Sequence, residues 1–125
     1  MSRVLVIEDS SDIRLLLTQM LEGEGYEVTV AEDGLEGLQV DATISPDLVV
    51  LDVNLPTIDG YEVCRRLKER RNVPVLLLTV RAEEDEVNQG MQAGADLHIS
   101  KPFEMTTFLN CVRTLLLRSS ISFQA

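Results

Sequence analysis

The chain has 125 residues, of which 45% are hydrophobic, and a formal net charge of −10 at pH 7. This length and composition fit one globular domain and exclude a disordered or collagen-like chain. The acidic balance disfavours direct contact with nucleic acid or an anionic membrane, and no apolar run reaches the roughly 20 residues of a membrane span, so we expect a cytoplasmic protein.

Five short apolar runs predict β-strands, and they lie at residues 4–7, 28–30, 48–51, 75–78 and 97–99. Between the runs, apolar residues recur at the helical period, which predicts five helices. The five stripes comprise Ile13, Leu16, Leu17, Met20 and Leu21; Leu35, Leu38 and Ala42; Val63, Cys64 and Leu67; Val87, Met91 and Ala95; and Phe108, Val112, Leu115 and Leu116. Strands that are apolar throughout and alternate with helices are typical of a parallel sheet covered on both faces.

The predicted fold class is therefore α/β, with a doubly wound, five-stranded parallel sheet of order 2-1-3-4-5 flanked by five helices. One domain is expected over residues 1–118, followed by a C-terminal tail or truncated linker at 119–125. Asp9 or Ser10 is suited to cap the first helix, because short polar side chains accept hydrogen bonds from free backbone N–H groups.

Two groups of residues have a structural interpretation. Cys64 and Cys111 lack the spacing of metal ligands, and we expect both to be free thiols. Five of the eleven basic residues lie within residues 65–71. We interpret this cluster as a solvated helix face, whose cations suit the negative end of the helix dipole, rather than as a docking patch.

Polar side chains follow four of the five predicted strands at the point where each strand ends. The first run ends in Glu8 and Asp9, the third in Asp52 and the fourth in Thr79, while Lys101 follows the fifth. In a doubly wound parallel sheet, ligands bind at the carboxyl ends of the strands. We therefore expect these five side chains to face a single cleft.

Three clustered carboxylates would raise one another's pKa unless a cation held them ionised. The expected ligands are all oxygen atoms, without His or Cys, and this set favours a hard divalent ion, above all Mg²⁺. Lys101 would add a second, fixed positive charge.

The segments "VIEDS", "LVVLDVNLPTIDG", "LLLT" and "GADLHISKPF" resemble the CheY-like, flavodoxin-like receiver domains of response regulators in two-component signalling. The resemblance runs from about residue 3 to 118. It implies a signalling domain rather than an enzyme acting on a separate substrate. It also implies that Asp52 accepts the phosphoryl group, while Thr79 and Lys101 hold its oxygens. The implied Mg²⁺ ligands are Asp9 directly, Glu8 through water and the main-chain carbonyl of Asn54. The resemblance further implies a cis Lys101-Pro102 bond.

The partner implied by the resemblance is a histidine kinase or a histidine phosphotransfer protein. We expect the donor to dock beside the cleft, against Arg14, Leu15 and Phe103. Leu15 falls off the apolar stripe of its helix and should face water.

Receivers signal when the Thr79 position and a side chain on the fifth strand move, which reshapes the face built from the fourth helix, fifth strand and fifth helix. That strand position is usually Tyr or Phe and is His98 here. We expect His98 to be the switch residue, with some pH sensitivity, because protonation would penalise its buried rotamer. Val80 replaces the usual Ala or Gly and should narrow the path of water and small phosphodonors.

Single residues argue against two other functions. A haloacid-dehalogenase-type Mg²⁺ phosphohydrolase would need an acid at Asn54, and a flavodoxin-like electron carrier would not tolerate "EDSSD" beside FMN phosphate. In winged-helix DNA-binding regulators, charged residues of the receiver form ion pairs across an activated dimer. At the matching positions of this chain, only Asp96 and Arg113 are charged. We therefore favour a stand-alone receiver or another output, with the N-terminal receiver of a DNA-binding transcription regulator as the alternative. The output partner is unknown, and a phosphorylation-dependent homodimer is to be tested.

Overall fold

The computed structural model describes residues 2–80 and 89–124, with side-chain environments up to residue 118. Its centre is a five-stranded parallel sheet of order β2-β1-β3-β4-β5, which confirms the predicted topology. The strands are β1 (Arg3–Ile7), β2 (Glu27–Ala31), β3 (Leu48–Asp52), β4 (Val75–Thr79) and β5 (Leu97–Ser100).

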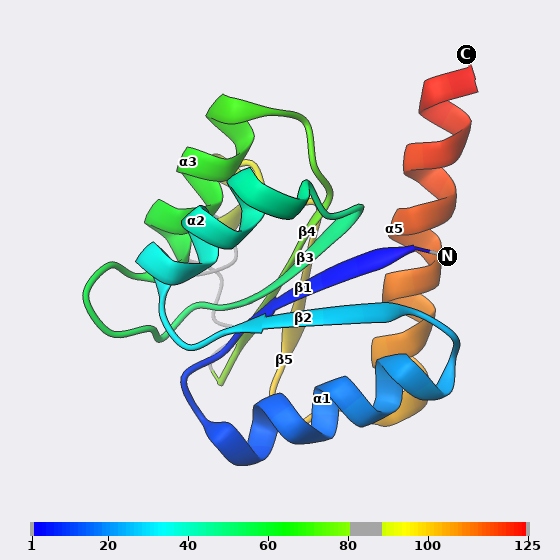
Figure 1. The fold of residues 1–125 in the computed structure, drawn as a ribbon, viewed down its shortest axis with the longest axis horizontal. Coiled ribbons are helices and arrows are strands. Elements are labelled where there is room, and N and C mark those ends of the chain that lie inside the picture. The colour runs from blue at the N-terminus through cyan, green and yellow to red at the C-terminus, as the bar shows by residue number, and fades with distance from the viewer. Residues whose placement is uncertain (1, 81–88, 125) are drawn as a thin grey trace.

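Helices cover both faces of the sheet, with α2 and α3 on one face and α1 and α5 on the other (Figure 1). Their bounds are α1 (Ser11–Gly23), α2 (Gly34–Ile44), α3 (Gly60–Arg70) and α5 (Met105–Gln124). Residues 89–92 are also helical, whereas the first part of the expected fourth helix, with Val87, lies outside the described residues. No helix in the described part of the chain is long and apolar enough to cross a bilayer. Because α5 runs to Gln124, the domain boundary at residue 118 stays a prediction.

The core consists of two apolar layers, one on each side of the sheet. Successive side chains of a strand point to opposite faces. Leu5 and Ile7 of β1 therefore pack toward α2 and α3, whereas Val4 and Val6 pack toward α1 and α5. All four are fully buried. This burial on both faces explains why the strand sequences show apolar runs without alternation.

The apolar stripe predicted for helix α2 was partly wrong, because glycine and Asp41 occupy part of the face that the helix buries. Leu35 is 46% exposed and Ala42 is exposed, although Leu38 is buried as predicted. Gly37 faces the sheet instead, and a Cβ atom there would lie 2.4 Å from Ile7 Cδ1. Because α2 lies so close to β1, only glycine fits at this position.

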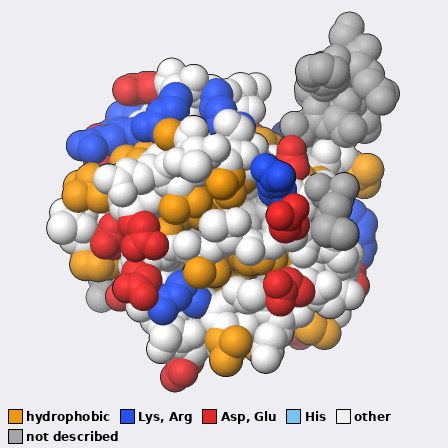
Figure 2. Space-filling model, in the orientation of Figure 1, with side chains coloured by type: hydrophobic (Ala, Val, Ile, Leu, Met, Phe, Trp, Pro, Cys, Tyr) orange, Lys and Arg blue, Asp and Glu red, His pale blue; other side chains and the backbone are white. Residues whose placement is uncertain are grey.

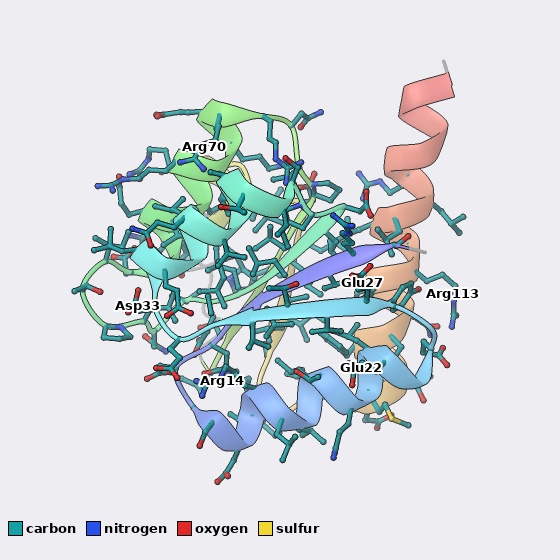
Figure 3. All side chains as sticks on the ribbon, in the orientation of Figure 1. Arg14, Glu22, Glu27, Asp33, Arg70 and Arg113 are labelled. Carbon is teal, nitrogen blue, oxygen red and sulfur yellow. The ribbon has the colours of Figure 1, made fainter. Side chains whose placement is uncertain are left out.

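The basic cluster at residues 65–71 is in part a solvated face, since Arg65, Arg66 and Arg70 are exposed, but two of its arginines also form ion pairs with a buried acid. Asp41 on α2 is fully buried, and its Oδ1 atom lies 2.7 Å from Arg71 Nη2. Arg70 Nη1 lies 3.5 Å from Asp41 Oδ2, and Figure 3 shows Arg70 between α2 and α3. Figure 2 shows Lys and Arg side chains gathered over this region. Since a buried carboxylate is costly without a partner, these cations have a structural role.

Each of three helices begins with a side chain that accepts a backbone hydrogen bond. Ser10 Oγ accepts from Ile13 N at 3.3 Å, which decides between the two predicted caps of α1. Asp33 caps α2 and Asp59 caps α3 in the same way. Such caps typically contribute about 1 kcal/mol each. The α1 cap also fixes the turn that joins β1 to the helix, where two of the expected site residues lie.

Candidate functional site

The carboxyl ends of β1, β3, β4 and β5 meet at one edge of the sheet, because neighbouring strands pair in parallel. This edge brings together Glu8, Asp9 and Asp52, each of which offers a carboxylate oxygen within 4.8 Å of the others. Thr79 ends β4 and is 1% exposed, and its carbonyl accepts from Lys101 N at 2.6 Å. The convergence predicted from the strand ends is thus present.

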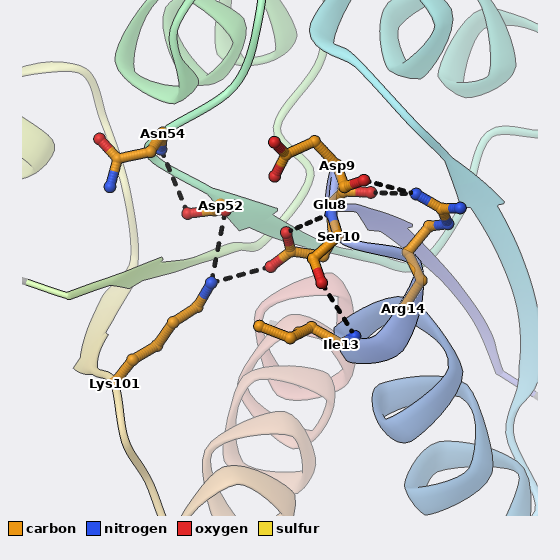
Figure 4. A network of polar contacts seen from close by, with 8 residues as sticks. All are labelled: Glu8, Asp9, Ser10, Ile13, Arg14, Asp52, Asn54 and Lys101. Carbon is orange, nitrogen blue, oxygen red and sulfur yellow. Dashed lines mark hydrogen bonds and ion pairs between the residues drawn. The ribbon is translucent and has the colours of Figure 1, made fainter.

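Lys101 lies between two buried carboxylates (Figure 4). Its Nζ atom is 2.8 Å from Glu8 Oε1 and 3.3 Å from Asp52 Oδ2. Glu8 and Asp52 are 1% and 4% exposed, so the ammonium compensates charge in a poorly solvated place. The second oxygen of Glu8, Oε2, accepts from Ser10 N at 3.0 Å. Both Glu8 oxygens are therefore engaged, which suits an outer rather than a direct metal ligand.

The charges of the site shift two pKa values in the same direction. Desolvation by burial, together with the hydrogen bond and the charge of Glu8, raises the pKa of Asp9. Burial lowers the pKa of Lys101, but the hydrogen bond with Glu8 and the charge of Asp52 outweigh it and raise that pKa. Lys101 is thus firmly cationic, and its charge only partly offsets the effects that raise the pKa of Asp9.

These residues fit a hard divalent cation. Asp9 is exposed and lines the adjacent cleft, and its carboxylate lies within 4.8 Å of those of Glu8 and Asp52, so a cation there would be close to three negative charges. Asp52 Oδ1 accepts from Asn54 N at 3.1 Å, which fixes the rotation of that carboxylate. The atoms of this cluster that could coordinate a cation are carboxylate oxygens, which Mg²⁺ prefers as ligands.

The loop after β3 is held close to Asp52 by Gly60. Gly60 N donates to Val53 O at 2.8 Å, and a Cβ atom at Gly60 would lie 2.4 Å from the main-chain oxygen of Asp52. No other residue fits there without displacing the backbone that carries Asp52. The "DG" of the β3–α3 segment thus combines a cap, Asp59, with a close approach of helix and strand.

Two hollows adjoin the acidic cluster. A cleft of about 840 Å³ is lined by Asp9, Val53, Asn54, Leu55, Pro56, Asp59, Tyr61, Val80 and Gln89. A second, apolar hollow of about 390 Å³, here called the apolar groove, is lined by Ile13, Leu16, Val80, Lys101, Pro102 and Phe103. Val80 is 61% exposed and borders both. The carboxyl edge of the sheet therefore has a polar hollow on one side and an apolar hollow on the other.

The sequence matches the family model of the response regulator receiver domain over residues 4–113. The chain is a response regulator receiver domain. It is 43% identical over 119 residues to response regulator MprA of Mycobacterium sp. (strain KMS), covering 94% of this chain and 52% of that protein. It is 41% identical over 121 residues to the alkaline phosphatase synthesis transcriptional regulatory protein PhoP of Bacillus subtilis (strain 168), covering 96% and 50%. The chain thus spans about half the length of these curated relatives.

Solved receiver structures have the same fold. A CheY-like response regulator receiver domain from Methanospirillum hungatei JF-1 is 28% identical, with a TM-score of 0.94 and coverage of 98% of both chains. The signal receiver domain of a signal transduction histidine kinase from Syntrophus aciditrophicus is 33% identical, with a TM-score of 0.86 and coverage of 93% of this chain and 90% of that one. The family and the fold class expected from the sequence are confirmed. The Lys101-Pro102 bond is cis, as the resemblance implied.

The three expected docking residues of this receiver differ in their surroundings. Leu15 is 59% exposed, as expected. Phe103 lines the apolar groove and stacks on Phe108 with ring centroids 5.4 Å apart. The Arg14 side chain is only 16% exposed and lies against the β1–α1 turn rather than in solvent. Its availability to a partner is therefore smaller than expected.

The sequence did not single out the remaining apolar lining of the groove. Leu16, placed on the buried stripe, is 52% exposed and lines the groove with Ile13 and Pro102. A signal was present in the run of three leucines at residues 15–17, because a helix cannot bury three consecutive side chains against one sheet.

His98 lies on the expected face of β5. Ile99 belongs to the apolar layer of α1 and α5, so His98, one residue earlier, points to the opposite side of the sheet. It is half-buried and lies opposite Leu77 in the strand register. A Cβ atom at Gly90 would lie 3.1 Å from His98 Cδ2 and 2.9 Å from Leu77 Cδ1. The ring thus packs against the helical segment at residues 89–92.

Proposed function

We propose that this receiver accepts a phosphoryl group on Asp52 in a reaction that requires Mg²⁺. The observation that carries the proposal is the cluster of three carboxylates around Lys101 at the carboxyl edge of the sheet. Asp9, Asp52 and the Asn54 main-chain carbonyl would hold the ion, with Glu8 acting through water. Mg²⁺ would supply positive charge where two anions approach each other.

The transferred group comes from a phosphorylated histidine of the partner. The N–P bond breaks with its electron pair left on the imidazole, and a new O–P bond forms to a carboxylate oxygen of Asp52. The transition state of phosphoryl transfer is loose, so alignment and charge stabilisation matter most. Lys101 and the hydroxyl of Thr79 would hold the phosphoryl oxygens, through a charge-assisted and a neutral hydrogen bond respectively. Water later hydrolyses the acyl phosphate.

The partner is a histidine kinase or histidine phosphotransfer protein, which would act in the cytoplasm. We place its docking surface at the apolar groove, with Leu15 and Phe103 contributing from the two sides. The groove borders Lys101 and Val80, so a protein seated there would have its histidine beside the acidic cluster. Arg14 would contribute mainly by holding the adjacent turn.

Substitution of Asp52 tests the acceptor assignment. Asp52→Asn and Asp52→Ala should abolish stable labelling by acetyl phosphate or by the phosphorylated partner in the presence of Mg²⁺. Asp47→Asn is the matched control, because Asp47 is an exposed acid that precedes β3 at the opposite end of the strand. Labelling of Asp52→Asn at the unaltered level would overturn the assignment.

The proposed response to phosphorylation is movement of Thr79 and His98. Support comes from the place of His98, whose ring is packed against residues 89–92 rather than free in solvent. NMR spectra of the His98 ring with and without beryllofluoride test this step. Unmoved ring signals in a receiver that binds beryllofluoride would exclude the switch role.

The output of this receiver is a separate question. The names and lengths of the curated relatives favour the N-terminal receiver of a transcription regulator, whereas the altered charges favour a stand-alone receiver or another output. We propose that, in either context, it lacks the charge-paired dimer of winged-helix regulators. Both remaining charges are engaged within the chain: Asp96 Oδ2 lies 2.6 Å from Lys68 Nζ, and Arg113 Nη2 lies 3.0 Å from Glu24 Oε1.

Size-exclusion chromatography with and without beryllofluoride measures the oligomeric state of the receiver. We expect the receiver to stay monomeric at concentrations where charge-paired receivers dimerise. A beryllofluoride-dependent dimer that Arg113→Ala disrupts would overturn the proposal.

A further inference from the structure

Arg14 lies in the first turns of α1, but its side chain turns back toward the end of β1. Only 16% of the side chain is exposed, although the residues on both sides of the helix start are open to solvent. Figure 4 shows the guanidinium beside the main chain of the turn that carries Glu8 and Asp9. This position is unusual for a residue expected to meet a partner.

The contacts of Arg14 are with the backbone of the two acidic residues. Arg14 Nη1 donates to Glu8 O at 2.9 Å and to Asp9 O at 3.1 Å. Two successive carbonyls thus share one donor group, and they must point in nearly the same direction for this to occur. The geometry requires a turn of defined shape, which a planar, rigid guanidinium is suited to hold.

The guanidinium is itself held from a third segment. Arg14 Nη2 lies 3.5 Å from Glu32 Oε1, in the loop after β2. Glu32 is 70% exposed at its side chain, so this pair contributes little stability by itself. Its effect is on orientation, because it limits the rotation of the guanidinium over the turn.

The shape of this turn decides where the Asp9 carboxylate lies. An Asp side chain has two rotatable bonds, so its oxygens follow the direction of its Cα–Cβ bond closely. Glu8 is fixed separately, by Lys101 and by Ser10 N, but Asp9 is exposed at the rim of the cleft. The contacts of Arg14 with the main chain therefore set the direction of the Asp9 side chain, in addition to the hydrogen bond that this side chain shares with Glu8.

We propose that Arg14 is a positioning residue for the cation site, which presets the β1–α1 turn so that Asp9 and Asp52 can share one ion. This inference rests on the proposed function, because it assumes that these two carboxylates bind Mg²⁺. It assigns to Arg14 a role in metal affinity rather than in partner docking.

Calorimetric titration with MgCl₂ tests the inference on three variants. Arg14→Met removes the donors and keeps the apolar stem. Arg14→Lys keeps length and charge but replaces the fork by a single ammonium. Arg113→Met is the matched control, since Arg113 is a half-exposed arginine that also pairs with an acid at 3.0 Å, on α5.

We expect Arg14→Met to weaken Mg²⁺ affinity about tenfold, as outer-sphere substitutions at metal sites commonly do. Arg14→Lys should weaken it roughly fivefold, because an ammonium does not reproduce the guanidinium geometry, and Arg113→Met should match the unaltered receiver. Thermal unfolding without Mg²⁺ reports any loss of fold in Arg14→Met, and Arg14→Lys then provides the decisive comparison.

A second readout separates positioning from general stability. The Mg²⁺ concentration for half-maximal labelling by acetyl phosphate should rise in both Arg14 variants, while the rate at saturating Mg²⁺ should return to that of the unaltered receiver. Affinities of Arg14→Lys within twofold of the unaltered receiver would overturn the inference. Failure of the unaltered receiver to bind Mg²⁺ would instead overturn the cation assignment of the proposed function.

Discussion

Arg71 Nη2 lies 2.7 Å from Oδ1 of Asp41, and the Asp41 side chain is fully buried between α2 and α3. The same Nη2 atom donates to Pro46 O at 2.8 Å. One arginine thus joins the end of α3 to α2 and to the turn before β3. The pair is a fixed part of the fold, since a buried carboxylate without a cation is strongly destabilising.

Arg71→Met should lower the free energy of unfolding by about 3 kcal/mol, because the buried Asp41 carboxylate then keeps only its longer and weaker ion pair with Arg70. Arg66→Met is the control, since Arg66 pairs with Glu62 at a half-exposed site and should contribute less than about 0.5 kcal/mol. Urea unfolding monitored by circular dichroism measures both. Equal losses in the two variants would contradict the structural role of Arg71.

The raised pKa of Asp9 predicts a pH dependence of stability without Mg²⁺. A carboxyl whose pKa is higher in the folded state binds its proton more readily there, so it stabilises the fold below its unfolded pKa. This contribution is lost as pH rises through the folded pKa. Asp9→Asn should therefore raise the midpoint of thermal unfolding at pH 7, and the gain should vanish toward pH 3.

Mg²⁺ should reverse the sign of that difference. The unaltered receiver gains stability from the bound ion, whereas Asp9→Asn loses a ligand and gains little. Thermal unfolding of the unaltered receiver and of Asp9→Asn, with and without Mg²⁺ at ten times the dissociation constant, measures this difference. Binding at that concentration should stabilise the unaltered receiver by roughly 1.4 kcal/mol. A neutral-pH midpoint for Asp9→Asn below that of the metal-free receiver would contradict the charge argument.

Val80 should slow the access of small molecules to Asp52, since it is 61% exposed and borders the cleft. Val80→Ala removes two methyl groups and should speed both autodephosphorylation and labelling by acetyl phosphate. We expect less than a tenfold change, equivalent to a barrier difference below ~1.4 kcal/mol. Val30→Ala is the control, because Val30 is an exposed valine on β2. Equal or slower rates in Val80→Ala would refute the steric role.

Thr57 has a backbone angle φ of +69°, in the loop between β3 and α3. A β-branched residue is strained in this left-handed region by about 1–2 kcal/mol. Thr57→Gly removes the strain but increases the freedom of the unfolded chain, so we expect a net gain of about 0.5 kcal/mol. Urea unfolding checks the sign. A loss of stability would show that the Thr57 side chain makes a contribution larger than its strain.

The two cysteines should differ in reactivity. Both are free thiols, as the sequence predicted. Burial raises the pKa of Cys64 to about 11, and the Cys64 side chain is fully buried. Burial also raises the pKa of Cys111, which is only half-buried. Iodoacetamide at pH 8 should therefore label Cys111 first, and Cys64 only when the protein unfolds. Mass spectrometry of partly labelled protein measures the order, and labelling of Cys64 before Cys111 would contradict the prediction.

The sequence predicted the fold and the meeting of the site residues because both follow from periodicity and parallel topology. Apolar runs set the strands, and parallel pairing brings the polar residue after each strand to the same edge. Glu8, Asp52 and Lys101 could thus be placed together without any knowledge of their contacts.

The sequence could not predict contacts between charges far apart in the chain. The Asp41–Arg71 pair spans 30 positions and replaces an apolar residue at an inward position of α2. A search for apolar stripes passes over such a carboxylate and selects Leu35 and Ala42 instead. The backbone contacts of Arg14 could not be predicted for a related reason, because they depend on the rotamer of a long side chain.

Val80 separates the acidic cleft from the apolar groove and belongs to the walls of both. On the proposed function, a donor seated in the groove would cover one flank of this valine and leave water a narrower approach to a phosphorylated Asp52. The donor would then protect the acyl phosphate from hydrolysis for as long as it stayed bound. The lifetime of the signal would be counted from the departure of the donor.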